Sequence, residues 1–218
     1  MAMAPNQNCA AILALVAIAC FVMGGSAGAD ENERGADLFR LCAVCHGEDA
    51  SGAQAVGAPA IAGMPQWYLE AQLKQFRNGN RGTHFDDLMG MRMRPMARSL
   101  MREGDVEAVS AHIAALPPVD PAPTLTGGDV EAGKAIFSTI CITCHGPEAA
   151  GNKDMMGAAP LNRSSDWYMF RQVRNFKSGI RGSRPGDQGG ALMRPMMLQL
   201  KDDQDIKNVV AYIMTLGN

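Results

Sequence analysis

The sequence predicts an all-α fold in two tandem copies, and two observations carry this prediction. First, the chain of 218 residues contains an internal repeat whose matched residues keep their order at a spacing of about one hundred positions, which indicates a duplication. Second, apolar residues recur at helical spacings in both copies, and no stretch shows the sustained alternation of a strand. The repeated positions include Trp67 and Trp167, Gln72 and Gln172, Phe76 and Phe176, Arg81 and Arg181, and Asp105 and Asp205.

Within the first copy, helices are expected at three places: 35–44, 67–77 and 106–116. In the second of these, Leu69, Leu73 and Phe76 are spaced four and three residues apart and form one apolar face. Gly79 then marks the end of that helix. The final helix of the second copy is expected to begin near Asp202, because a carboxylate there suits an N-cap and the helix dipole.

Two small domains and a spacer follow from the repeat. The segment 117–125 contains four prolines, and such segments favour an extended, semi-rigid chain. We therefore expect domain one over residues 30–116, a Pro-rich linker over 117–125 and domain two over 126–218. Each domain has fewer than 100 residues, which is small for a self-sufficient core.

The segment 1–29 is predicted to be a secretory signal peptide. Residues 10–23 are almost wholly apolar, a run shorter than the ~20 residues of a helix that spans a bilayer. Ala27 and Ala29 form an A-x-A site, so cleavage is expected after Ala29 and export to the bacterial periplasm follows. An uncleaved anchor is the alternative, because no charged side chain precedes Asp30.

Composition excludes several classes of protein. The formal net charge is -2, so the chain lacks the basic surplus that drives nucleic-acid binding, and no nucleic-acid partner is expected. Hydrophobic residues make up 47% of the chain, which excludes a disordered protein. Methionines number 16 while aromatic residues make up only 6%, so we expect something other than aromatic side chains to fill the interior.

The motif that carries chemistry is C-x-x-C-H, which occurs once in each copy. Two thiols three positions apart lie on one side of a helical turn and add to the two vinyl groups of a haem, and the histidine then faces the iron. Two motifs at matching positions predict two covalently attached haem c groups. The motif residues are Cys42, Cys45 and His46 in domain one, and Cys141, Cys144 and His145 in domain two.

Other interpretations of the paired cysteines are less well supported. A zinc site needs both pairs to converge, whereas a linker and a whole domain separate them. A thioredoxin-like redox pair belongs to a βαβ context, which the sequence lacks. Two disulfides would be ordinary for an exported chain with four cysteines, but this spacing argues against them.

Each haem iron needs a second axial ligand from the chain. Outside the motifs only His84 and His112 remain; neither repeats in the other copy, so both are predicted to be structural or surface residues. Met-Arg-Pro-Met occurs in both copies before the final helix, and methionine with histidine is typical of electron-transfer cytochromes c. Alternatively, these methionines fill the core. The candidate ligands are Met93 or Met96 in domain one, and Met193 or Met196 in domain two.

On these motifs the chain resembles the dihaem cytochromes of the cytochrome c4 type, which consist of two class I cytochrome c domains. The resemblance covers residues 30–218 and implies two tandem class I cytochrome c-like domains, each wrapped around one covalent haem. In that family the ligand methionine lies seven residues before a leucine, which Leu100 and Leu200 match. The implied pairs of iron ligands are His46 with Met93 and His145 with Met193.

Further residues are expected beside the haems. The resemblance implies that the carbonyl of Pro59 accepts a hydrogen bond from the proximal histidine, with Pro160 as the candidate in domain two. Arg81 and Arg181 are candidate partners of the haem propionates, since guanidinium binds carboxylates in a bidentate way; the alternative is a solvated surface charge. The aromatic residues expected to pack against a haem or its edge are Trp67 and Trp167.

The leading functional hypothesis is an electron carrier rather than an enzyme. Two haems with both axial positions filled relay one electron at a time and leave no open iron site. The resemblance implies transfer in the periplasm, from a quinol-oxidising complex or a periplasmic dehydrogenase to a terminal oxidase. The alternatives are a dihaem enzyme of the thiosulfate dehydrogenase or peroxidase type, which needs an open or exchangeable ligand, and a cytochrome subunit of a larger dehydrogenase complex.

Overall fold

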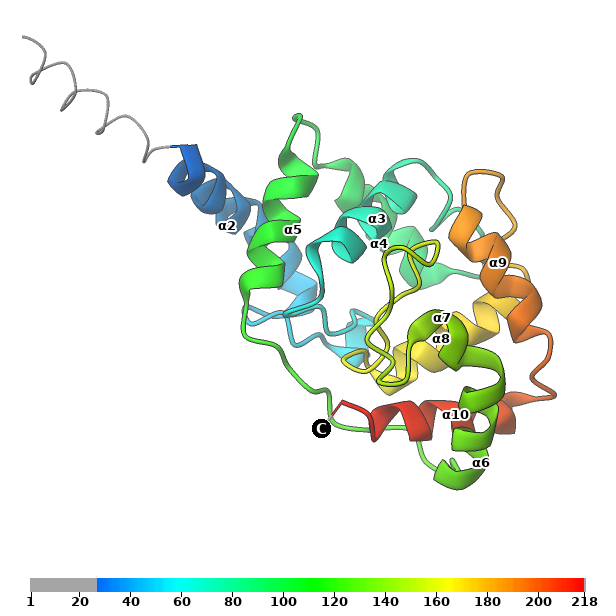
Figure 1. The fold of residues 1–218 in the computed structure, drawn as a ribbon. Coiled ribbons are helices and arrows are strands. Elements are labelled where there is room, and N and C mark those ends of the chain that lie inside the picture. The colour runs from blue at the N-terminus through cyan, green and yellow to red at the C-terminus, as the bar shows by residue number, and fades with distance from the viewer. Residues whose placement is uncertain (1–26, 218) are drawn as a thin grey trace, which may run out of the picture.

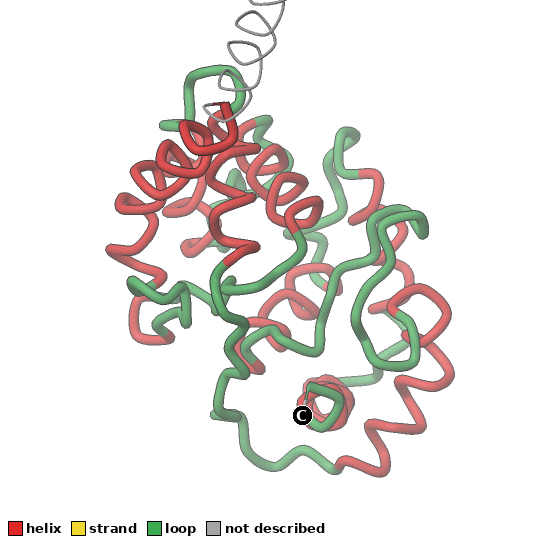
Figure 2. Tube along the Cα trace, turned by 60° about the vertical axis from the view of Figure 1, so that its left-hand side comes forward, coloured by secondary structure: helices red, strands yellow, loops and turns green. Residues whose placement is uncertain are grey.

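The computed structural model describes residues 27–217, and their side chains from residue 32 onward. The first group of helices comprises α2 (Ala27–His46), the 3-10 turn η1 (Gln54–Val56), α3 (Gln66–Arg77), α4 (Leu88–Arg98) and α5 (Asp105–Ala115). The second comprises α6 (Val130–Ile136), the π segment η2 (Phe137–Cys141), α7 (Ile142–His145), α8 (Asp166–Lys177), α9 (Gln188–Met197) and α10 (Asp203–Met214). Figure 1 shows the two groups side by side. The described part of the chain contains helices and loops but no strand, which confirms the all-α fold class (Figure 2).

In each domain the first helix crosses the last helix at a glycine. α2 packs against α5, and α6 packs against α10. A Cβ at Gly35 would collide with the carbonyl oxygen of Ala108, and a Cβ at Gly133 would collide with that of Asn208. Only glycine lets the two backbones approach so closely. Gly35 in domain one and Gly133 in domain two therefore allow the close packing of the first helix on the last.

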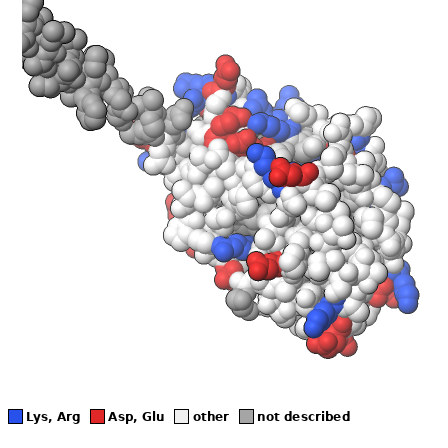
Figure 3. Space-filling model, in the orientation of Figure 1, with Lys and Arg blue, Asp and Glu red and all other residues white. Residues whose placement is uncertain are grey.

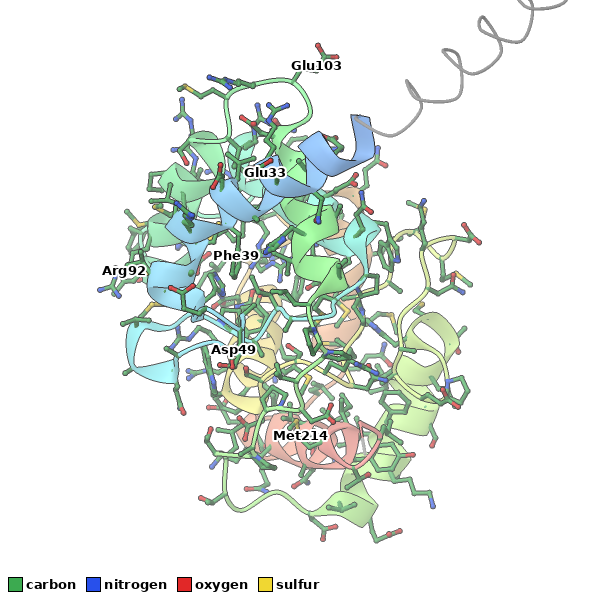
Figure 4. The ribbon with its side chains drawn as sticks, turned by 90° about the vertical axis from the view of Figure 1, so that its left-hand side faces the viewer. Glu33, Phe39, Asp49, Arg92, Glu103 and Met214 are labelled. Carbon is green, nitrogen blue, oxygen red and sulfur yellow. The ribbon has the colours of Figure 1, made fainter. Side chains whose placement is uncertain are left out.

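Each domain buries its own apolar core. Figure 4 shows Phe39 in the interior of domain one, whereas Arg92 and Glu103 lie at its periphery. The rings of Phe39 and His112 are 5.4 Å apart, and the matching rings of Phe137 and Tyr212 in domain two are also 5.4 Å apart. His112 therefore packs between α5 and α2, in the structural role expected for it.

The first helix is continuous in domain one but contains a π segment in domain two. Phe39 and Phe137 occupy matching core positions, yet Phe39 lies three residues before Cys42 and Phe137 lies four residues before Cys141. The additional residue is accommodated in η2, whose wider turn takes up one residue without breaking the helix. Both the core phenylalanine and the motif cysteine thereby keep their places.

The chain between α5 and α6 passes between the domains without a helix (Figure 2). Its end is held by Asp166, in the first turn of α8. The carboxylate accepts hydrogen bonds from the backbone N–H of Thr124 at 2.5 Å and of Leu125 at 2.6 Å, and from the Thr124 hydroxyl at 2.9 Å. Asp166 is buried, and a buried carboxylate requires such partners. The linker is therefore fastened to domain two.

The predicted signal peptide falls mainly outside the described residues, because residues 1–26 are not among them. Cleavage after Ala29 stays a prediction. Among the helices described, none is long and apolar enough to cross a membrane.

Charged side chains are spread in small groups on the face drawn in Figure 3. Opposite charges lie close to one another there, and broad areas without charge separate the groups. This face therefore carries no extended surface of a single sign, in keeping with a net charge of -2.

Candidate functional site

Both C-x-x-C-H motifs lie at the C-terminal end of the first helix of their domain. Cys42, Cys45 and His46 occupy the last turns of α2. Gly47 then adopts a left-handed conformation, with φ of 84°, and ends the helix. Domain two repeats this arrangement at the end of α7, where Gly146 also has a positive φ. The two motifs are thus presented in the same way.

No disulfide joins the four cysteines in the described part of the chain, and in each motif the first is half-buried and the second exposed. Burial raises the pKa of Cys42 to about 11 and that of Cys141 to about 12. A catalytic redox pair instead depends on a thiol with a lowered pKa. Among the described residues, no three His, Cys, Asp or Glu side chains are grouped to hold a metal ion. The geometry suits thioether attachment rather than dithiol or zinc chemistry.

The histidine of each motif is held by a backbone carbonyl. Nδ1 of His46 lies 2.9 Å from the carbonyl oxygen of Pro59, and Nδ1 of His145 lies 2.8 Å from that of Ala159. Because a carbonyl oxygen only accepts, Nδ1 carries the proton and Nε2 keeps its lone pair. Burial lowers the pKa of both imidazoles, and the hydrogen bond to the carbonyl opposes this in part. Each ring is therefore a neutral, oriented nitrogen donor suited to haem iron.

In domain two the carbonyl acceptor belongs to Ala159, so the prediction of Pro160 was wrong. The histidine and its acceptor are 13 positions apart in domain one and 14 in domain two. The loop is bounded in both domains by an antiparallel bridge, which encloses one residue more in domain two. Matching Pro59 with Pro160 by residue type assumed a loop two residues longer. Pro160 instead takes the place of Ala60, one residue beyond the acceptor.

The methionine motifs lie within α4 and α9, the helices that precede the last helix of each domain. Met93 and Met193 are half-buried, and each packs against the same core as the first cysteine of its motif. Met196 also packs against its core, but its sulfur accepts a hydrogen bond from Gln199 at 3.6 Å. These contacts favour Met93 and Met193 over the later methionines as iron ligands.

Arg81 and Arg181 lie at the junction of the two domains. Arg81 donates to Gln72 Oε1 of its own domain at 2.5 Å. It also donates across the junction to the Tyr168 hydroxyl at 3.0 Å and to Gln172 Oε1 at 3.2 Å. Arg181 donates to the same Gln172 Oε1 at 2.9 Å. The two guanidinium groups therefore meet at one amide oxygen.

Neither guanidinium forms a salt bridge with a carboxylate within the described part of the chain. The Nε atoms of Arg81 and Arg181 are both buried without an acceptor. Burial, and then the like charge of Arg81, lowers the pKa of Arg181 to about 10. Two adjacent cations, one buried and one half-buried, are stabilised by an anion. Asp87 and Asp187 act on these charges from beyond salt-bridge distance. Haem propionates would supply the acceptor oxygens that the two Nε atoms lack, so the residues present fit a haem in each domain.

Each tryptophan lies against the opposite domain. A side chain at Gly157 would touch the ring of Trp67. Trp167 lines a cavity of about 380 Å³ together with Gly52 of domain one and with the linker residue Val119. Each ring also packs edge-on against the tyrosine that follows it in its own domain, Tyr68 or Tyr168. Packing of either ring against a haem stays a prediction.

Several residues of this site were not anticipated from the sequence. Gln172 and Tyr168 join the domains, and both recur one hundred positions earlier as Gln72 and Tyr68. That repetition is a signal that points to them. Ser165, which bonds to domain one, has a proline at the matching position 65, so the repeat carries no signal for it.

Comparison with known proteins agrees with this arrangement. The cytochrome c family model matches residues 32–117 and again 130–217. A protein of Stutzerimonas stutzeri (strain A1501) named thiosulfate dehydrogenase electron acceptor is 31% identical over 81% of this chain and 79% of its own length.

Two solved structures are also similar. Thiosulfate dehydrogenase from Marichromatium purpuratum aligns with a TM-score of 0.67 at 29% identity, over 84% of this chain but only 40% of its own. Cytochrome c4 from Acidithiobacillus ferrooxidans aligns with a TM-score of 0.62 at 25% identity, over 80% of this chain and 98% of its own. Two domains with two attachment motifs carry two covalent haem c groups, and the chain belongs to the cytochrome c family as a dihaem protein of the cytochrome c4-like kind.

Proposed function

We propose that this protein is a periplasmic carrier that relays single electrons through its two haems and carries out no substrate chemistry of its own. The observation that supports this most strongly is the equivalence of the two sites. Each domain offers one carbonyl-held histidine and one core-packed methionine as axial ligands. With both axial positions filled, no iron is open to a substrate, and histidine with methionine is the ligand pair of electron-transfer cytochromes c. The proposed ligand pairs are His46 with Met93 and His145 with Met193.

The proposed route between the haems crosses the junction of the two domains. Arg81 and Arg181 meet there at Gln172 without a carboxylate partner, and we assign the propionates of the two haems to them. This assignment places the two redox groups near one another, on either side of a buried polar contact.

The proposed donor is a periplasmic dehydrogenase that oxidises thiosulfate, and the proposed acceptor is a terminal oxidase. The donor is favoured because a relative at 31% identity is named as the electron acceptor of thiosulfate dehydrogenase. In the Marichromatium purpuratum structure, the region similar to this chain is part of a longer polypeptide, which also fits a close association with a dehydrogenase. A quinol-oxidising complex is the alternative donor.

Stopped-flow spectroscopy tests this proposal. Thiosulfate with a catalytic amount of a purified thiosulfate dehydrogenase should reduce both haems of the oxidised protein, whereas thiosulfate alone should reduce neither. Reduction by thiosulfate alone, over repeated turnovers, would overturn the carrier proposal in favour of an enzyme. Reduction by a quinol-oxidising complex but not by the dehydrogenase would overturn the proposed donor only.

A further inference from the structure

One buried hydrogen bond joins domain two to the loop that holds the motif histidine of domain one. The backbone N–H of Ala60 donates to Oγ of Ser165 at 3.2 Å, across 105 positions of sequence. Ala60 is 2% exposed and Ser165 is 3% exposed. A buried N–H must find an acceptor, and here the other domain supplies it.

This N–H belongs to the same peptide group that holds His46. The carbonyl of Pro59 accepts from Nδ1 of His46, and the N–H on the other side of that peptide bond is that of Ala60. Hydrogen bonds in a chain polarise one another, so a bond to the N–H makes the carbonyl a stronger acceptor. Ser165 therefore acts on His46 through a single peptide unit.

Domain two cannot use the same device. Its acceptor carbonyl is that of Ala159, and the next residue is Pro160, which has no N–H to donate. The position that matches Ser165 in domain one is Pro65, which has no hydroxyl. Both proximal histidines thus donate to a backbone carbonyl. Only in domain one does the N–H of that same peptide group donate to the other domain.

Ser165 is held firmly enough to exert this effect. It lies immediately before α8, and the adjacent Asp166 fastens the linker through three hydrogen bonds. The serine therefore directly precedes a helix whose first residue is bonded to the linker. Its hydroxyl reaches domain one only while the two domains are packed together.

We infer that Ser165 is a positioning residue through which domain two strengthens the hydrogen bond between His46 and Pro59 and thereby lowers the reduction potential of the haem in domain one. A stronger hydrogen bond from Nδ1 makes the imidazole a better electron donor. A better donor stabilises the oxidised iron, and hydrogen bonding around the axial ligand is one of the means by which a protein sets the potential. The inference requires the two covalent haems but does not depend on which protein is the donor.

A matched pair of variants of the full dihaem protein tests the hydroxyl alone. Ser165→Thr keeps the acceptor oxygen, and Ser165→Val has the same shape without it. The control is Ser164→Ala, because Ser164 is also buried and its hydroxyl makes no hydrogen bond within the described residues. The two reduction potentials are measured by spectroelectrochemistry. In the reduced protein, the Nδ1 proton resonances of His46 and His145 are followed by NMR.

The potential of the domain-one haem should be higher in Ser165→Val than in Ser165→Thr, and that of domain two should be the same in both. The His46 Nδ1 proton should move upfield in Ser165→Val, as a weakened hydrogen bond requires, while that of His145 stays in place. Equal potentials in the two variants, a lower potential in Ser165→Val, or equal shifts at both haems would overturn the inference. If Ser165→Val does not fold, Ser165→Ala replaces it in the same comparison.

Discussion

The two domains share one architecture and differ in the bonds around the proximal histidine. In domain one the peptide that holds His46 also donates its N–H to the other domain. In domain two the corresponding peptide ends at Pro160 and has no N–H to donate. Duplication therefore preserves the attachment chemistry while the contacts between domains make the two sites unequal.

The junction shows the same inequality in its arginines. Arg81 is 4% exposed and donates to three side chains, two of them in the other domain. Arg181 is half-buried, and among the described residues its one side-chain acceptor is Gln172. At Gln172, domain one thus supplies the cation that crosses the junction, and two of the three acceptors of Arg81 belong to domain two.

The largest expected effect comes from removing one proposed methionine ligand at a time. Met93→Ala and Met193→Ala should each abolish about half of the weak far-red absorption band that sulfur-to-iron ligation gives, and each should lower the potential of one haem, because thioether ligation raises it. Met96→Ala is the matched control and should leave the band unchanged. A full band in Met93→Ala together with a halved band in Met96→Ala would exchange the roles of the two methionines.

A second large effect is expected where the first and last helices cross. Gly35→Ala and Gly133→Ala each place a methyl group against a backbone carbonyl, and we expect each to lower the free energy of unfolding by about 1–3 kcal/mol. Gly189→Ala in α9 is the control for helix propensity, since the nearest atom there, the carbonyl oxygen of Met156, is 3.2 Å from the added Cβ, a tight contact but no collision. Thermal unfolding of the three variants measures the difference. Stabilities equal to that of the unmodified protein would show that the crossings are loose.

Replacing the two junction arginines should show a smaller difference in stability between the domains. Arg81→Met removes three hydrogen bonds and Arg181→Met removes one. Since a hydrogen bond to a charged group contributes about 1.5–3 kcal/mol, and Arg181 still bonds to Gln172 when Arg81 is removed, Arg81→Met should be the less stable variant by at least about 1.5 kcal/mol. Denaturant titrations of both proteins give this comparison. Equal losses would mean that the haem propionates, rather than the protein acceptors, dominate both sites.

The smallest effect is expected at two surface ion pairs, one within each domain, which join equivalent pairs of helices. Lys74 and Glu107 are 2.8 Å apart between α3 and α5, and Arg174 and Asp203 are 3.5 Å apart between α8 and the start of α10. Glu107→Gln and Asp203→Asn should each cost less than about 1 kcal/mol, because such pairs are exposed and screened by salt.

The first of these pairs also predicts a dependence on pH. The hydrogen bond from Lys74 lowers the pKa of Glu107, so the folded protein holds this carboxylate charged more readily than the unfolded chain does. The stabilisation is present above the ordinary glutamate pKa of about 4.3 and is lost as the pH falls through the lowered value. Comparing acid unfolding of Glu107→Gln with that of the unmodified protein measures it. A larger difference at low pH than at neutral pH would contradict this sign.

The repeat in the sequence was sufficient to predict the helices around the two motifs, because its matched residues are the core and attachment positions. It did not reveal α4 and α9 over the methionine motifs, since Pro95 and Pro195 lie inside these helices and proline usually ends a helix. The repeat also led to the wrong acceptor in domain two, because Pro59 was matched with the proline at position 160. The loop of domain two is only one residue longer, so the acceptor is the residue before that proline. The structure places the additional residue inside the bridged loop.

The contacts between the domains were the least predictable part of the site. The approach of Ser165 to Ala60 depends on how two separately folded units pack, and neither residue repeats in kind. Arg81 and Arg181 were recognised as candidates for an anion, but their meeting at Gln172 follows only from the packing of α8 beside domain one. Local sequence patterns predict the attachment and ligand residues within each domain. The packing of the two domains against each other determines how the surroundings of these residues differ.

The proposed carrier function depends on both haems having their two axial positions filled by the chain. Electron paramagnetic resonance of the oxidised, unmodified protein tests this most directly, with the optical spectrum recorded on the same sample. We expect two low-spin ferric signals of equal intensity and the far-red band of methionine ligation. A high-spin signal from either haem would rule out the pure carrier, because it would reveal an open iron position and thus a site for a substrate.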